Sequence, residues 1–97
     1  MSGQGNPSIH LRVITSRRLL VEADTDGISL PTLEGYIGIL PGHRPLVIGL
    51  GRGTLSYRIG GEEERFSVQG GQAQVLPEEV VVLTELSEDE TVEPSSE

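Results

Sequence analysis

The sequence has 97 residues, a formal net charge of −8 and no cysteine. This length fits one domain with a modest core, and the lack of cysteine excludes disulfides and thiolate chemistry. Six of the fifteen acids lie in the last 13 positions, so the rest of the chain, with nine acids and seven arginines, is nearly neutral. With three aromatic residues and no cationic cluster, the composition argues against nucleic-acid binding.

Both ends of the chain are predicted to be disordered. Residues 1–8 form a lead-in of small and polar residues, without the basic region and apolar segment of a secretory signal. Residues 87–97 form an acidic tail that contains proline and serine. The predicted domain therefore covers residues 9–86, and no run of 18 apolar residues predicts a membrane-spanning helix.

The first half of the domain is predicted to form five short strands. From residue 9 to 13 apolar and polar residues alternate, as in a half-buried strand. A second strand from Leu19 ends at the turn signal Asp26-Gly27, and a third is expected to stop at Pro31. The remaining two strands are predicted over residues 36–40 and 46–50.

The second half continues this pattern of strands and glycine turns. Residues 54–59 alternate strictly, which predicts that Leu55, Tyr57 and Ile59 face inward. Gly60-Gly61 predicts a hairpin turn in which both residues take positive φ. Phe66 and Val68 are expected to continue the inward set, and Ala73 and Val75 are expected to share one face of their strand. The apolar run 80–83 predicts a strand that is covered on both faces.

The pattern contains about nine short strands and no helical period. Many short strands with close turns are typical of a sandwich or a barrel, so the predicted fold is all-β.

A rigid corner lies near the middle of the chain, at Leu40-Pro41-Gly42-His43. Proline presets a negative φ and glycine accepts a positive one, so the pair fits the central positions of a type II turn. His43, Arg44 and Pro45 extend the corner. From spacing alone it is either a turn with an exposed histidine or an edge that faces a partner, since a rigid corner loses little entropy on binding.

Three other patterns predict ordinary loops instead of ligand sites. Gly49-x-Gly51-x-Gly53 has the wrong spacing for a dinucleotide loop and precedes a strand. The acidic stretch 22–27 lacks the bidentate acid of a calcium loop. His10 and His43 are the only histidines, too few for a usual catalytic zinc site, and no serine lies in a nucleophile elbow.

Residues 34–46 resemble the signature of the epsilon subunit of F-type ATP synthase, whose mitochondrial counterpart is called delta. Residues 66–71 and 75–83 resemble two later motifs of that family in the right order. The resemblance implies a ten-stranded β-sandwich of two sheets, without catalysis and without a cofactor. It also implies a central-stalk rotor subunit that couples the gamma subunit of F1 to the c-subunit ring of Fo in proton-driven ATP synthesis.

The resemblance implies two partner-binding segments. Pro41, Gly42, His43 and Arg44 correspond to the gamma-facing corner. Leu33, Glu34, Gly35 and Tyr36 correspond to the loop that rests on the c ring. Many members carry an acid at the position of Tyr36, so Glu34 is expected to supply the charge contact with the ring instead. At the position of Gln72 the family usually has an apolar residue, so this spot is more polar here.

The family usually continues into a helical hairpin, whereas this chain carries the acidic tail at that junction. We therefore expect a member without the hairpin, or a trimmed piece of one. Membrane association is expected only through the complex, at the cytoplasmic face of the bacterial inner membrane. Two alternatives remain: a small cupin-like metal or ligand-binding sandwich that uses His10 and His43, and an interaction module that uses the tail to reach a basic partner.

Overall fold

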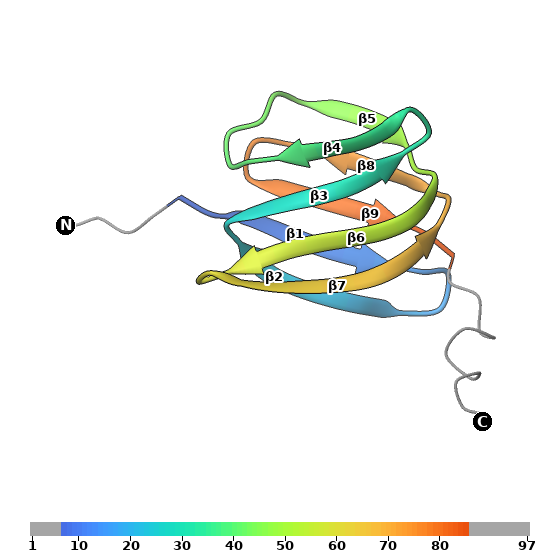
Figure 1. The fold of residues 1–97 in the computed structure, drawn as a ribbon, viewed down its shortest axis with the longest axis horizontal. Helices are drawn as coiled ribbons and strands as arrows, with labels where there is room; N and C mark the ends of the chain where they lie inside the picture. Colours follow the sequence, from blue (N-terminus) through green and yellow to red (C-terminus); the bar gives the residue numbers. More distant parts are fainter. Residues whose placement is uncertain (1–6, 86–97) are drawn as a thin grey trace.

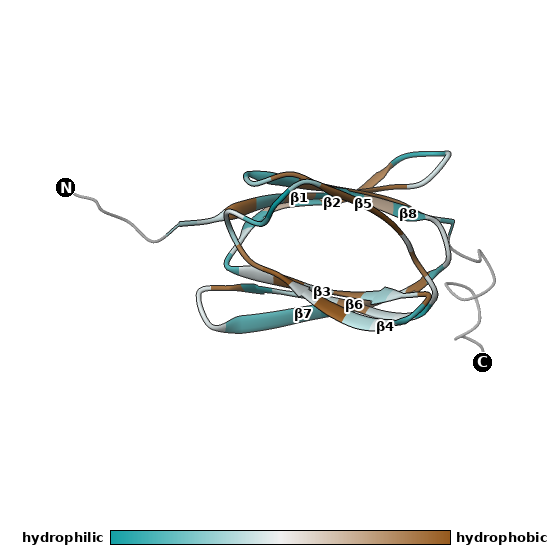
Figure 2. Ribbon diagram, turned by 90° about the horizontal axis from the view of Figure 1, so that it is seen from above, coloured by the Kyte–Doolittle hydropathy of each residue, from teal (hydrophilic) through white to brown (hydrophobic). Residues whose placement is uncertain are grey.

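The computed structural model describes residues 7–85, which fold as two sheets packed face to face (Figures 1 and 2). Its nine strands are β1 (Ile9–Ile14), β2 (Leu19–Thr25), β3 (Gly27–Thr32), β4 (Gly35–Ile39), β5 (Leu46–Gly49), β6 (Arg52–Ile59), β7 (Glu62–Gln69), β8 (Gln72–Val75) and β9 (Glu79–Leu83). The predicted all-β sandwich is confirmed. Its described part has nine strands instead of the ten that the resemblance implied.

The five-stranded sheet has the order β2-β1-β9-β8-β5, and the four-stranded sheet has the order β4-β3-β6-β7. All neighbours pair antiparallel except β1 and β9, which run parallel. The first and last strands therefore lie side by side inside one sheet. An isolated bridge joins Thr32, at the end of β3, to Leu50, which lies between β5 and β6.

The core consists of apolar side chains on the inner faces of both sheets. The buried apolar residues are Ile9, Leu11, Val13, Ile28, Leu30, Ile39, Leu50, Leu55, Val68, Ala73, Val75, Val80 and Val82. Buried and more exposed side chains alternate along β1 and β8, which confirms the alternation predicted for these two strands. The buried Thr25 hydroxyl donates a hydrogen bond to the Ile9 carbonyl, 3.0 Å away, so this polar group is satisfied.

Pro31 does not end the third strand as predicted. β3 continues through it to Thr32, and Pro31 pairs in register with Tyr36 of β4. β6 pairs only with residues 27–29 of β3, so the missing N–H of Pro31 interrupts no ladder on that side. The Pro31 carbonyl accepts a hydrogen bond from the Gly51 N–H at 2.9 Å.

Two strands are less covered than predicted. Ile59 was expected to face inward but is 44% exposed, because it lies at the end of the β6–β7 hairpin, where residues 58–65 are all exposed. The run 80–83 was expected to be covered on both faces. Val80 and Val82 are buried, but Val81 is half-buried and Leu83 is 44% exposed, since no described layer covers the outer face of that sheet.

The predicted acidic tail and residues 1–6 of the predicted lead-in lie outside the described residues. Pro7 and Ser8 precede β1 and belong to no strand. Within residues 7–85, no helix is long and apolar enough to cross a membrane.

Candidate interaction site

The corner between β4 and β5 is a type II turn, as predicted. Gly42 has a φ of 88°, close to the value of the third turn residue, and the His43 N–H donates to the Leu40 carbonyl at 3.1 Å. The Gly42 N–H donates to the Pro77 carbonyl at 2.8 Å, which fixes the corner to the β8–β9 turn. The corner is therefore held from two sides.

The corner presents apolar and cationic groups to solvent. Leu40 is 65% exposed, Arg44 is exposed, and Pro41 and His43 are half-buried. The His43 Nδ1 lies 2.8 Å from the Arg44 carbonyl oxygen, so the tautomer that carries the proton on Nδ1 donates to it. The imidazole thus has a fixed orientation at the surface.

The loop between β3 and β4 is also held by its own side chains and backbone. The Thr32 hydroxyl accepts a hydrogen bond from the Glu34 N–H at 3.1 Å and donates one to the Gly35 carbonyl. The Leu33 N–H donates to the Gly49 carbonyl at 3.3 Å. Leu33 is 76% exposed and Glu34 is exposed, so the loop presents an apolar side chain beside a carboxylate.

Tyr36 lies along the four-stranded sheet. Its hydroxyl accepts a hydrogen bond from the Thr54 N–H at 3.0 Å. A Cβ built on Gly53 would lie 2.6 Å from the Tyr36 hydroxyl oxygen and 2.8 Å from the Pro31 Cβ. Glycine at position 53 therefore leaves the space that the tyrosine occupies.

The structure separates the two predicted segments. The loop with Leu33 and Glu34 precedes β4, and the corner of Pro41 to Arg44 follows it, so they lie at opposite ends of the sandwich (Figure 1). Gly35 and Tyr36 belong to the first residues of β4 itself. The eight predicted residues thus form two surfaces, which we call the corner and the loop.

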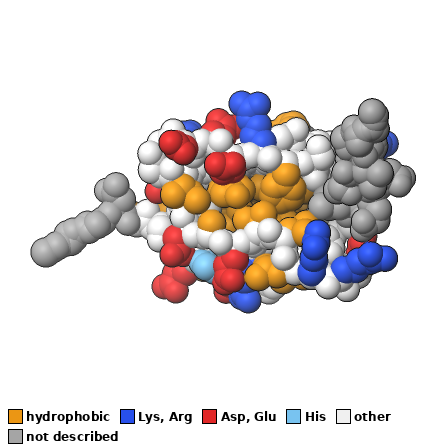
Figure 3. Space-filling model, turned by 90° about the horizontal axis from the view of Figure 1, so that it is seen from below, with side chains coloured by type: hydrophobic (Ala, Val, Ile, Leu, Met, Phe, Trp, Pro, Cys, Tyr) orange, Lys and Arg blue, Asp and Glu red, His pale blue; other side chains and the backbone are white. Residues whose placement is uncertain are grey.

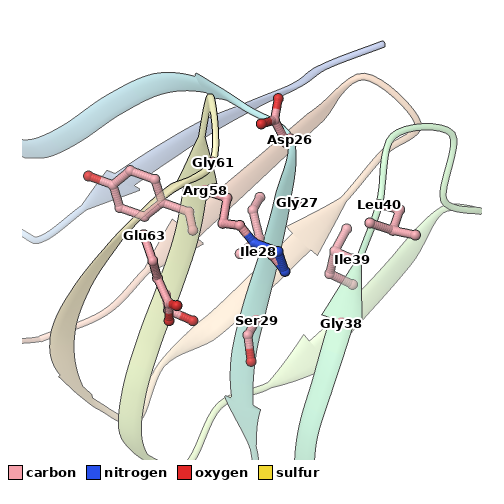
Figure 4. Close-up of a pocket in the computed structure, with 12 residues that line it drawn as sticks. Asp26, Gly27, Ile28, Ser29, Gly38, Ile39, Leu40, Arg58, Gly61 and Glu63 are labelled. Atoms are coloured by element: carbon pink, nitrogen blue, oxygen red, sulfur yellow. The ribbon is translucent and has the colours of Figure 1, made fainter. Parts of the chain in front are cut away.

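A groove of about 410 Å³ crosses the outer face of the four-stranded sheet beside the corner (Figure 4). Ser29 and Gly38 belong to its lining, and the Arg58 guanidinium lies over β3. The Leu40 Cδ2 lies 3.1 Å from a Cβ built on Gly27, so Leu40 closes the groove toward the corner. Sequence reasoning missed this groove. Its only signal was the small residues at outward positions of neighbouring strands.

His10 lies in a charged cluster on the outer face of the five-stranded sheet. Its Nδ1 is 2.7 Å from a carboxylate oxygen of Asp24, and its Nε2 is 2.9 Å from one of Glu22. The hydrogen bond with Asp24, and then the one with Glu22, raises the pKa of His10 above 6.5. Arg12 forms an ion pair with Glu79 on the neighbouring β9. The cluster ties β2, β1 and β9 together.

The metal site considered for His10 and His43 has no counterpart in the described geometry. Among residues 7–85, no group of three or more His, Cys, Asp or Glu side chains is placed to hold a metal ion.

An apolar strip lies at the edge of the sandwich between β2 and β7 (Figure 3). Leu20, Val21, Tyr57 and Phe66 are partly buried side chains that pack against the core. Burial raises the pKa of Tyr57, and the nearby Glu64 carboxylate adds to this. Figure 3 also shows acidic side chains toward one end of this edge and arginines toward the other.

Comparison with known proteins identifies the family. The model of the family described as "ATP synthase, Delta/Epsilon chain, beta-sandwich domain" matches residues 8–90. ATP synthase epsilon chains of Solibacter usitatus and Chloroflexus aggregans are each 42% identical, over 84% and 82% of this chain. These matches cover 60% and 58% of the two relatives, so the chain spans about three fifths of their length.

Solved structures agree with the sequence comparison. A chain of the Euglena gracilis mitochondrial ATP synthase, in a cryo-EM structure of OSCP/F1/c-ring, matches with a TM-score of 0.75 and 30% identity, over 84% of this chain and 54% of that one. A chain from the Tetrahymena thermophila mitochondrial ATP synthase, central stalk and c-ring, matches with a TM-score of 0.67. It is 15% identical over 92% of this chain and 73% of that one, and so shows the fold alone. The chain belongs to the delta/epsilon family of ATP synthase subunits, of which residues 8–90 match the β-sandwich domain.

Proposed function

We propose that the chain is a non-catalytic rotor subunit of F-type ATP synthase that couples the gamma subunit of F1 to the c-subunit ring in proton-driven ATP synthesis. The observation that carries this proposal is the placement of the corner and the loop at opposite ends of one sandwich. Family membership and the match to a chain of an F1/c-ring assembly support it.

The physical properties of the sandwich suit a part that transmits torque between two partners. Packed interiors have low compressibility, so a force applied at one end of the sandwich reaches the other with little deformation. Both surfaces are pre-organised by hydrogen bonds: the corner through Pro77, and the loop through Thr32 and Gly49. Binding at either surface therefore orders little backbone, which favours affinity.

In this proposal the corner, with Pro41, Gly42, His43 and Arg44, faces gamma, and the loop, with Leu33 to Tyr36, faces the c ring. The protein would then lie at the cytoplasmic face of the bacterial inner membrane, and would associate with the membrane only through the complex.

The experiment is assembly with gamma. We expect the purified protein to form a stable 1:1 complex with gamma on size-exclusion chromatography, and the His43→Ala variant to bind more weakly. The Leu33→Ala variant is the control, because Leu33 lies at the other end of β4. The absence of a complex at micromolar concentration would overturn the proposal.

A further inference from the structure

We propose that Arg52 is part of the ring-facing surface together with Leu33 and Glu34, and that Tyr36 holds this surface in position through its hydroxyl. The inference rests on the proposed function, because it concerns the c ring as the partner. It changes the predicted surface in two ways: it adds a cation from β6, and it makes the tyrosine a positioning residue.

Arg52 lies beside the loop although it is 18 positions after Glu34 in the chain. It opens β6 at the end of the sandwich where β3 turns into β4. A shallow pocket of about 540 Å³ joins it to the loop, and the pocket is lined by Leu33, Leu50, Gly51, Arg52, Gln69 and Gly70. Arg52 and Glu34 are both exposed.

The backbone holds Arg52 in this place. The N–H of the preceding Gly51 donates a hydrogen bond to the Pro31 carbonyl at 2.9 Å. The Gly51 carbonyl accepts one from the Gly70 N–H at 3.1 Å. A Cβ built on Gly51 would lie 3.0 Å from the Thr32 carbonyl oxygen, which shows how closely the two segments approach. The loop and the start of β6 are therefore one surface and not two independent ones.

Tyr36 is 60% exposed and borders this surface, and its hydroxyl also supports the surface from β6. The hydrogen bond from the Thr54 N–H to its hydroxyl ties the start of β4 to β6, two residues beyond Arg52. The hydroxyl fills the space next to Gly53, where a Cβ would lie only 2.6 Å from the hydroxyl oxygen. The tyrosine thus fixes the separation between the segment that carries Glu34 and the segment that carries Arg52.

This arrangement selects the chemistry of the partner. The surface presents one carboxylate and one guanidinium beside the apolar Leu33 side chain, and charge complementarity favours a polar loop of the ring that offers a cation to Glu34 and an acid or carbonyl to Arg52. Arginine suits the second contact because its planar group can donate two parallel hydrogen bonds.

The test is ring binding by the preformed complex of this chain with gamma, added to purified c ring in detergent. We expect Arg52→Glu to weaken binding roughly fivefold, the size typical of one exposed charge contact, and the loss to shrink at high salt. Arg58→Glu makes the same charge change at the other end of β6 and is expected to bind as wild type does.

Tyr36→Phe tests the positioning role separately. In the free chain we expect the Thr54 amide to exchange hydrogen roughly two- to tenfold faster, the effect of one hydrogen bond, without a change at core amides such as that of Leu11. The affinity of the same variant for the c ring should fall, although phenylalanine keeps the aromatic group.

The outcomes separate the two proposals. If the wild-type complex with gamma fails to bind the ring, the ring-facing part of the proposed function fails, and this inference fails with it. If Leu33→Ala and Glu34→Lys weaken ring binding while Arg52→Glu does not, only the inference is overturned. Unchanged exchange at Thr54 in Tyr36→Phe would overturn the positioning role.

Discussion

Gly42 determines the geometry of the corner, because its φ of 88° is one that side chains with a Cβ rarely adopt. Nothing lies within 4 Å of a Cβ built there, so a substitution acts through the backbone and not through a clash. We expect Gly42→Ala to lower the free energy of unfolding by about 1–2 kcal/mol, and Gly42→Val by more.

Urea denaturation measures this, with Gly38→Ala as the matched control. Gly38 also has open space around it but lies in β4 with an ordinary φ, so alanine there should be neutral or slightly stabilising. Equal stability of the two variants would mean that the turn does not depend on a positive φ.

His10 makes the stability of the domain depend on pH. Its pKa is raised in the folded state, chiefly by Asp24, so its stabilisation is full below the ordinary value of 6.5 and is lost as pH rises through the folded pKa. We expect this part of the unfolding free energy to decline from about pH 6.5 upward.

Asp24→Asn removes the largest cause of the raised pKa and is expected to flatten the pH dependence of stability. Chemical denaturation between pH 5 and 9 and the NMR titration of His10 measure the two effects. A His10 titration midpoint that stays the same in Asp24→Asn would contradict the assignment of cause.

At the scale of single residues, the sequence predicts what depends on neighbouring residues. The positive φ of Gly42, Gly60 and Gly61 follows from turn chemistry within a few positions, and all three are confirmed. The position of the Tyr36 hydroxyl depends on a hydrogen bond from the Thr54 N–H, 18 residues further along the chain. No local sequence pattern predicts that hydrogen bond.

At the scale of elements, β6 shows how far alternation predicts burial. Leu55 and Ile59 stand on the same predicted face, but Leu55 is fully buried and Ile59 is 44% exposed. The alternation gives the face of a strand, whereas burial also requires cover from other parts of the chain, and residues 58–65 at the end of the β6–β7 hairpin are all exposed. The same reasoning explains Leu83. The apolar run 80–83 predicted a strand covered on both faces, but no described layer covers the outer face of its sheet.

This difference predicts unequal costs of truncation along one strand. Leu55→Ala should lower the free energy of unfolding by about 2–5 kcal/mol, because it leaves a cavity in the core. Ile59→Ala should cost less than about 1 kcal/mol, as at other exposed positions. Chemical denaturation of the two variants checks this, and similar losses would mean that Ile59 is covered in solution.

At the scale of the whole molecule, the sequence predicted the sandwich but not which strands are neighbours. The parallel pairing of β1 with β9 joins residues about 70 positions apart, and local alternation carries no information about such pairing. The placement of the corner and the loop at opposite ends follows from β4 between them and from this topology. The resemblance had assigned residues 33–36 and 41–44 to two partners, but only the fold shows that these neighbouring segments lie at opposite ends.

The separation of the corner from the loop leads to a prediction about independence. β4 has five residues, so the two surfaces lie roughly 15–20 Å apart at about 3.4 Å per residue. Substitutions at such a distance without shared partners have additive effects within about 0.5 kcal/mol. We expect His43→Ala to keep the domain folded and to weaken binding to gamma, and Leu33→Ala to weaken binding to the ring.

The double variant tests whether the sandwich behaves as a rigid spacer. The quantity measured is the free energy of assembly of gamma, this chain and the c ring. The losses that His43→Ala and Leu33→Ala cause singly should sum in the double variant. Coupling above about 1 kcal/mol would show that a change at the corner alters the loop through β4. In the proposed function, the sandwich would then transmit torque by a change between two conformations and not through the stiffness of its packed core.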